Sequence, residues 1–255
     1  MTVKRLAERL ATVMGLVLPM SAFASDDSVP RIAIDYDLSI AGISIGDASL
    51  LAEEKAASGY AAQFDMSFRF LFWSGAAAGY SVGHIVDGGR VPAKYDVTFE
   101  GMSKPVVIKT GFDSDGPVDW SITPPPEDKF LKERVPLAQA DLRGAIDPLS
   151  AMLIQANSPD QACNRTLEIF TGGTRLDLVL RPGRATEPGV FACDVTYRPV
   201  SGHRADSESV ARLVKNGPIL SIFEVAPDLW APHRVGIATS VGTLAVTRIL
   251  PEKAD

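Results

Sequence analysis

The chain is poor in the residues that metal centres and many active sites need. It has three histidines and two cysteines among 255 residues, and the histidines lie far apart in the sequence. No H-E-x-x-H or comparable ligand spacing occurs, and a P-loop and a G-x-G-x-x-G motif after a strand are also missing. We therefore expect no metal site and no cofactor, and we expect a protein that is not an enzyme.

Long apolar runs and an excess of basic residues are missing as well. After residue 24, no segment approaches the roughly 18 uninterrupted apolar residues of a membrane span, so no transmembrane segment is predicted. Acidic residues outnumber basic ones by 31 to 25, which gives a net charge of −6. Such a chain is not expected to bind nucleic acid, and its overall charge disfavours electrostatic attraction to anionic lipids.

What the chain does have, at its start, is the order of a secretory signal peptide. A basic stretch at residues 4–9 precedes a short apolar run over residues 10–20, and residues 22–24 read A-x-A. We expect cleavage after residue 24, which leaves 22 basic and 30 acidic groups, a net charge of −8. Because no cysteine lies at the cleavage site, residues 25–255 are expected to form one soluble, β-rich periplasmic domain without a lipid anchor.

The interpretation of the two cysteines, Cys163 and Cys193, depends on the predicted export of the chain. An even number of cysteines in an exported chain predicts a disulfide. Closing a loop of about 30 residues would stabilise the fold by roughly 3–4 kcal/mol in the chain-entropy model. Two unpaired, buried thiols are the alternative.

Period-two alternation of apolar and polar residues dominates the chain. It is clearest over residues 32–40 and 60–70, where it predicts strands with one buried and one solvent-facing side in an antiparallel sheet. Glycine-containing turns at residues 87–89, 113–116 and 172–173 divide much of the rest into hairpins. We count about ten or eleven strands.

Helix signals are few. Asp147 followed by Pro148 is a helix start, and helical spacing of apolar residues predicts a helix over Asp147–Asn157. Residues 71–78 fit either a helix or a bulged strand, and residues 206–215 fit a short connecting helix. The proline-rich segment Pro124–Pro136 cannot be a central strand and is either a solvated crossover or a lid.

Together these elements predict a mainly β fold. The sheet is expected to be strongly curved and antiparallel, a β-spiral or half-barrel that wraps one or two short helices. His84 shares the apolar phase of its strand with Val82 and Val86, which predicts a partly buried histidine.

Two groups of residues are candidates for a binding site. Phe64, Phe68, Phe70 and Trp73 (with Phe72) are bulky, and little helix is available to cover them. They either fill the core or line a concave apolar surface for a ligand. The loop residues His203 and Arg204, close to Ser201 and Asp206, form a turn, an anion-binding group or, least favoured, the base of a hydrolase.

The order of several short motifs resembles a known family. In chain order the motifs are Tyr36-Asp37-Leu38, Gly42–Gly46, Gly88–Tyr95, Asp147–Ser150, Cys163 before Gly172-Gly173, and Cys193 before Tyr197-Arg198-Pro199 and Gly202-His203. Across nearly all of the mature chain this order resembles the exported domain-of-unknown-function family 3108. More distantly it is similar to periplasmic β-spiral envelope proteins and to the lipoprotein carriers LolA and LolB.

The resemblance implies a role in maintaining the cell envelope, with a lipid or an envelope protein as partner. It implies no catalytic residues, and the acylated cysteine of LolB is missing here. Our leading hypothesis is a non-enzymatic periplasmic protein that binds a lipid or another hydrophobic ligand in a concave sheet. The alternatives are a protein-interaction module that uses an edge strand or the Pro124–Pro136 segment, and thirdly a hydrolase that uses His203.

Overall fold

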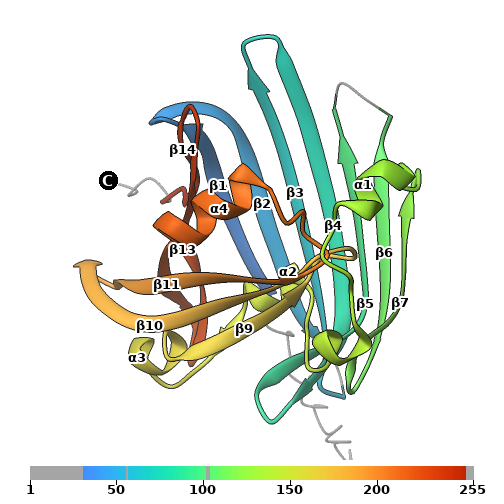
Figure 1. Ribbon diagram of the computed structural model, residues 1–255. Coiled ribbons are helices and arrows are strands. Elements are labelled where there is room, and N and C mark those ends of the chain that lie inside the picture. The colour runs from blue at the N-terminus through green and yellow to red at the C-terminus, as the bar shows by residue number, and fades with distance from the viewer. Residues whose placement is uncertain (1–30, 56, 102–103, 251–255) are drawn as a thin grey trace, which may run out of the picture.

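A computed structural model describes residues 31–55, 57–101 and 104–250 (Figure 1). The expected signal peptide lies outside these residues. Within them, fourteen strands belong to one antiparallel sheet. The strands are β1 (Arg31–Ile40), β2 (Ile43–Lys55), β3 (Gly59–Phe70), β4 (Trp73–Val86), β5 (Gly89–Glu100), β6 (Val106–Asp113), β7 (Gly116–Thr123), β8 (Ile154–Gln155), β9 (Arg165–Phe170), β10 (Arg175–Glu187), β11 (Val190–Ser201), β12 (Ile219–Ala226), β13 (Leu229–Thr239) and β14 (Gly242–Arg248).

The sheet consists of two meanders that meet in its middle. β1 to β7 pair in chain order, and β9 to β14 do the same, with the helix α4 (Glu208–Asn216) between β11 and β12. The strand β14 pairs with β1, with Tyr36 opposite Arg248. Figure 1 shows the first meander running upward at the back and right, while β9 to β11 cross in front of it. The curvature makes the sheet a nearly closed barrel, as the predicted half-barrel implies.

The segment between the meanders closes the seam between the edge strands β7 and β9. It contains α1 (Asp128–Lys132), a 3₁₀ turn η1 (Gln139–Leu142), α2 (Pro148–Ala151) and α3 (Pro159–Ala162). The amide of Gly144 donates to the carbonyl of Asp115 beside β7 (2.8 Å), and Ile146 pairs with Ile169 of β9. The ring of Trp120 contacts that of Phe170 edge to face, with centroids 5.2 Å apart. The edge strands β7 and β9 do not pair with each other, so side-chain contacts and the crossover segment close the barrel between them.

The helix predicted over Asp147–Asn157 forms only its first turn. Asp147 caps α2 by accepting hydrogen bonds from the amides of Leu149 and Ser150, as predicted, but the helix ends at Ala151. Ile154 and Gln155 instead form β8, which pairs with Leu229 and Trp230. The prediction is wrong here because a ladder with a distant strand satisfies the backbone that a longer helix would have used.

Other helix and strand predictions have mixed outcomes. Residues 206–215 form a helix, α4 (Glu208–Asn216), as predicted. Residues 71–78 are not helical, because residues from Trp73 onward begin β4 and pair in register with β3. His84 is exposed, not partly buried, because the inner face of β4 carries Ser81 and Gly83, so His84 shares the outer face with Val82 and Val86. The count of ten or eleven strands was too low.

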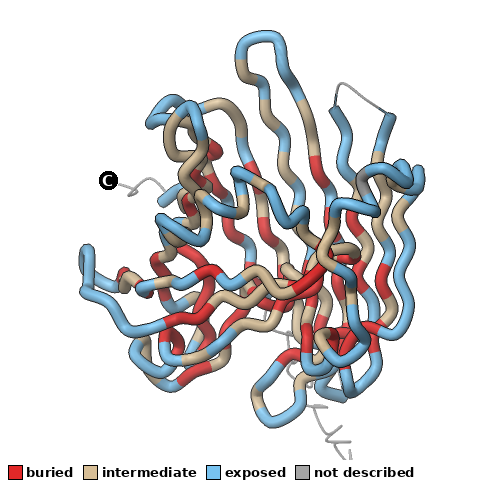
Figure 2. Tube along the Cα trace, viewed as in Figure 1, coloured by how far each residue is buried: buried red, intermediate tan, exposed pale blue. Residues whose placement is uncertain are grey.

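One end of the barrel is closed by a buried polar cluster around Asp147. Its carboxylate accepts from the hydroxyls of Ser81 (2.8 Å) and Ser150, and the Tyr60 hydroxyl lies 2.6 Å from that of Ser150. Burial raises the pKa of Asp147 and, with the Asp147 charge, raises the pKa of Tyr60 to about 12. Arg90, also buried, donates to the carbonyl of Leu153. We call this group the floor; in Figure 2 most buried residues lie in this lower half.

Candidate functional site

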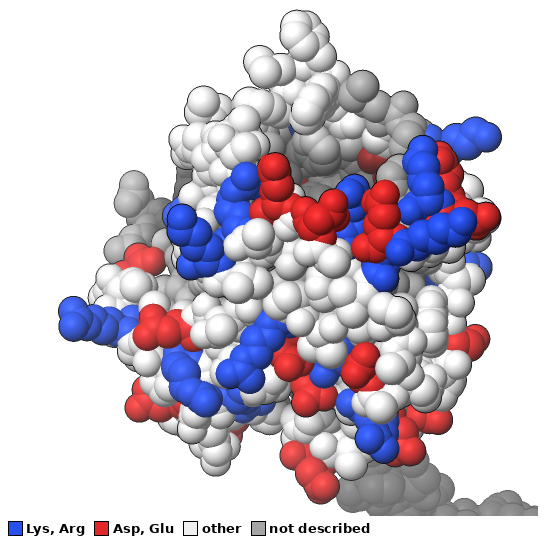
Figure 3. Space-filling model, viewed as in Figure 1, with Lys and Arg blue, Asp and Glu red and all other residues white. Residues whose placement is uncertain are grey.

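At the end opposite the floor, the barrel opens into an apolar cavity of about 530 Å³. It lies among the turns that join β1 to β2, β3 to β4 and β13 to β14. Figure 3 shows the molecule hollowed at this end, below the projecting β3–β4 hairpin. We call it the mouth cavity; its lining residues are Leu38, Ile40, Ile45, Met66, Phe68, Phe70, Leu71, Phe72, Trp73, Val241 and Leu244.

A second apolar cavity of about 280 Å³ lies deeper, between the two meanders. The two cavities follow one another along inner-face positions of the same strands. On β3, Phe64 lines the inner cavity and Met66 the mouth cavity; on β14, Val246 and Leu244 do the same. Because side chains two residues apart share a face of a strand, the two cavities follow each other on the inner face of the sheet, and together we call them the apolar path.

The path offers a ligand apolar contact and almost nothing else. No described residue lining either cavity is charged. The phenol of Tyr36 faces the inner cavity, but its hydroxyl donates to the carbonyl of Pro232 (3.0 Å). Burial raises the pKa of Tyr36, so the phenol stays neutral. A site of this kind binds by burial of apolar surface, and it supplies no acid, base or nucleophile.

The aromatic residues predicted as ligand-binding all lie on this path. Phe64 lines the inner cavity, and Phe68, Phe70 and Trp73 line the mouth cavity. Sequence reasoning missed the contribution of the second meander, Val241 and Leu244, whose position follows only from the pairing of β14 with β1. Alternation along β14 could have indicated an inner face, but not which strand it would meet.

His203 and Arg204 lie elsewhere, where the turn after β11 meets the Pro124–Pro136 segment. The amide of Val135 donates to the carbonyl of His203, and the amide of Gly202 donates to that of Val135, both at 2.8 Å. Arg204 forms ion pairs with Glu133 and Asp206. These bonds fix the end of the segment to the turn, in the manner of a crossover.

The turn does not hold a nucleophile and base in contact. The buried Ser201 hydroxyl and the Nδ1 of His203 make no hydrogen bond to any described residue. Beside the turn lies a groove of about 660 Å³, lined by the exposed Trp120 of β7, Pro125, Pro126 and Arg134 among others.

Two further features bear on chemistry. Residues Gly42–Gly46 read G-x-S-x-G, the letters of a nucleophile elbow, but an elbow needs a strand-to-helix turn. Here the motif begins β2 after a hairpin turn, and the Ser44 hydroxyl donates to Asp37. Across the described ranges, no group of three or more His, Cys, Asp or Glu side chains lies together in a way that could hold a metal.

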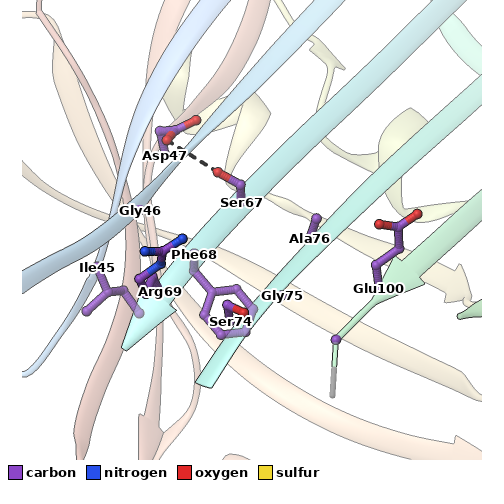
Figure 4. A pocket seen from close by; sticks show the side chains of 11 residues that line it. Ile45, Gly46, Asp47, Ser67, Phe68, Arg69, Ser74, Gly75, Ala76 and Glu100 are labelled. Atoms are coloured by element: carbon purple, nitrogen blue, oxygen red, sulfur yellow. Dashed lines mark hydrogen bonds between the residues drawn. The ribbon is translucent and has the colours of Figure 1, made fainter. Parts of the chain in front are cut away.

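The outer face of the sheet carries a shallow polar groove of about 490 Å³ (Figure 4). There the hydroxyl of Ser67 of β3 donates to the carboxylate of Asp47 of β2, with 3.4 Å between the two oxygen atoms, and Glu100 projects from β5. The depression exists because the strands present small residues at Gly46, Gly75 and Ala76. It is open and lacks enclosed apolar surface, so we place the candidate site in the mouth and inner cavities.

The predicted disulfide is present: Cys163, at the end of α3, bonds to Cys193 of β11. Within the residues that the structure covers, no helix is long and apolar enough to cross a membrane.

Comparisons with known proteins identify no family for this chain. No protein-family model and no curated protein matches the chain. A solved structure from Brucella abortus, a beta-barrel-like protein of domain of unknown function DUF1849, is similar with a TM-score of 0.43 and 10% sequence identity. The alignment covers 87% of this chain and 96% of that one. The resemblance to family 3108 and to the lipoprotein carriers stays a prediction.

Proposed function

We propose that this protein is a non-enzymatic binding protein that holds a lipid or another hydrophobic molecule inside its barrel. The observation that supports this most is the apolar path, two uncharged cavities that follow each other on the inner face of the sheet. Pockets for small ligands are typically about 300–1,000 Å³, mostly apolar and concave, and the mouth cavity lies in that range.

The shape and chemistry of the path favour an elongated apolar ligand. The cavities succeed each other along β3 and β14, so a chain could run from the mouth past Met66 to Phe64. Because no described lining residue is charged, a polar head group would stay at the mouth, in water. An acyl chain meets both conditions. We extend the role to the periplasm and the cell envelope on the basis of the signal peptide and the family resemblance alone.

A fluorescent fatty acid tests the proposal directly. We expect the purified protein to bind the probe, and Leu244→Trp, which adds volume inside the mouth cavity, to weaken binding at least tenfold. Val118→Trp is the matched control, because Val118 is exposed on β7 and lines neither cavity. Native mass spectrometry of protein isolated from the producing cells should show a bound lipid. A clean apo mass together with no probe binding would overturn the proposal.

A second function is supported by the groove beside the Pro124–Pro136 segment. Exposed Trp120 and two prolines line it at the edge strand β7, a combination that suits an extended peptide. On this alternative the protein recruits an envelope partner. Trp120→Ala would then abolish crosslinking to the partner while probe binding by the barrel is unchanged; unchanged crosslinking would exclude this groove.

A further inference from the structure

Three hairpin tips around the mouth cavity expose large apolar side chains to solvent. Phe72 is 95% exposed and Leu71 78%, and they form the two-residue turn between β3 and β4. Ile43, Trp73 and Val241 at the same end are each more than half exposed. Single exposed apolar residues are ordinary, but several together at one end of a molecule mark an interaction surface. We call these five residues the apolar tips.

The β3–β4 turn is built from residues that such a turn normally avoids. Two-residue hairpin turns favour Asn, Asp or Gly, because the backbone adopts positive φ. Here Leu71 has a φ of +54°, a conformation that is unusual for a bulky side chain. The neighbouring turn between β4 and β5 uses Asp87 and Gly88 as expected. A local strain that also places Leu71 and Phe72 in water is typical of a functional contact.

Charge is distributed so that the apolar tips avoid it. Residues 39–45, 68–75 and 239–244 include one charged side chain, Arg69, in a chain whose charged content is 22%. The turns at the opposite end of the first meander carry Asp87, Asp113 and Asp115. In Figure 3 the projecting β3–β4 hairpin is white, with Lys, Arg, Asp and Glu gathered below it. The three tip segments themselves therefore contain no acidic side chain.

We propose that the apolar tips dock this protein onto the surface of a lipid bilayer, with the mouth cavity opening toward the acyl chains. Leu71, Phe72, Trp73 and Val241 belong both to the tips and to the lining of the mouth cavity. Inserting the tips therefore places the entrance of the apolar path at the membrane. Arg69 beside them suits lipid phosphates, and no acidic residue in the three tip segments repels anionic head groups. The transfer of a lipid between bilayer and cavity rests on the proposed function; the docking does not.

Flotation with vesicles measures the docking separately from ligand uptake. We expect the protein to float with vesicles of phosphatidylethanolamine and phosphatidylglycerol. The double substitution Phe72→Ser and Trp73→Ser should lower the partition coefficient more than tenfold, because two large apolar side chains no longer enter the bilayer. Arg69→Gln should weaken binding only to vesicles that contain phosphatidylglycerol. Val86→Ser is the matched control, since Val86 is an exposed apolar residue at the other end of β4.

The outcomes distinguish docking from ligand binding. Uptake of the fluorescent fatty acid without flotation would overturn the docking and leave the proposed function standing. Flotation without uptake would support the docking and count against the proposed function. A photo-crosslinking amino acid at position 72 should label lipid in cells; labelling of protein alone would assign the tips to a protein partner and overturn the proposal. Flotation of the double variant like that of the unaltered protein would do the same.

Discussion

The two ends of the β3–β4 hairpin follow the same alternation of side chains, but the interior is filled at one end and open at the other. Near the start of β3, the inner residue Tyr60 lies against α2 in a network of hydroxyls and a carboxylate. Near its end, Phe68 and Phe70 face a cavity that no described helix fills. Alternation decides which face of a strand points inward. It does not decide whether that interior is occupied.

The difference lies in what the rest of the chain brings to each end. The crossover delivers Asp147 and α2 to the floor, and their polar groups are satisfied there. The open end receives the β13–β14 tip, where the amide of Ala41 donates to the carbonyl of Thr243. The floor therefore stabilises the fold, while the mouth is available for binding. The following predictions test that division.

Removing the carboxylate of the floor should have the largest effect. Asp147→Ala removes a helix cap and leaves the hydroxyls of Ser81 and Ser150 without their acceptor, so we expect the free energy of unfolding to fall by about 3 kcal/mol. Urea denaturation measures it. Asp147→Asn keeps an acceptor and should lose less than half as much. If Asp147→Ala costs less than 1 kcal/mol, the floor is not the stabilising end.

The second largest effect on the free energy of unfolding is expected from alkaline pH, which ionises Tyr60 in the floor. Burial, aided by the Asp147 charge, raises the pKa of Tyr60 from 10 to about 12, so the folded state binds this proton more tightly than the unfolded state does. The resulting stabilisation is complete below pH 10 and is lost as the pH rises through 12, a change of about 2–3 kcal/mol. Urea titrations from pH 9 to 12 should show a steeper decline for the unaltered protein than for Tyr60→Phe. Equal slopes would contradict the assignment.

Truncating an aromatic side chain of the mouth cavity should lower the free energy of unfolding less than either change at the floor. Phe68 is only partly buried, and its removal enlarges a cavity that is already open, so Phe68→Ala should lower the free energy of unfolding by about 1 kcal/mol. A Phe→Ala change in a closed core costs about 3–5 kcal/mol. The same variant should weaken fatty-acid binding. A loss as large as that of Asp147→Ala would show that both ends are equally structural.

The smallest effect on stability is expected at the tip. Phe72→Ser replaces a side chain that is 95% exposed, so the free energy of unfolding should change by less than about 0.5 kcal/mol. Thermal or urea unfolding would measure it, with the unaltered protein as reference. A clear destabilisation would mean that Phe72 packs against the barrel, and the contrast between the ends would then be smaller than we describe.

Much of the fold follows from local patterns in the sequence. Alternation predicts the inner faces of β1 and β3, glycine turns predict three hairpins, and Asp147 with Pro148 predicts the start of α2. Each of these signals depends only on residues close together in the sequence, so the sequence alone is enough to predict these elements. The aromatic residues Phe64 and Phe68 follow from the same alternation as members of the site.

What the sequence does not predict depends on distant partners. The helix over Asp147–Asn157 is cut short by pairing with β13, and the small residues Ser81 and Gly83, not the apolar Val82 and Val86, occupy the inner face of β4 near His84. The turn at Leu71 and Phe72 has none of the usual turn residues, so its residues resemble a helix or a bulged strand. The role of His203 and Arg204 as ligand-binding residues stays a prediction, since they lie outside both cavities.

The pairing of β1 with β14 also governs the order in which this protein can fold. The first meander can assemble from neighbouring hairpins, which form quickly because their loops are short, whereas the second must also place α4 between β11 and β12. The contact of Tyr36 with Arg248 closes almost the whole described chain into one loop, and such distant contacts are slow to form. Until the last strand is synthesised, β1 and β13 are unpaired edges open to aggregation. One edge of β1 therefore stays unpaired until synthesis of the chain is almost complete.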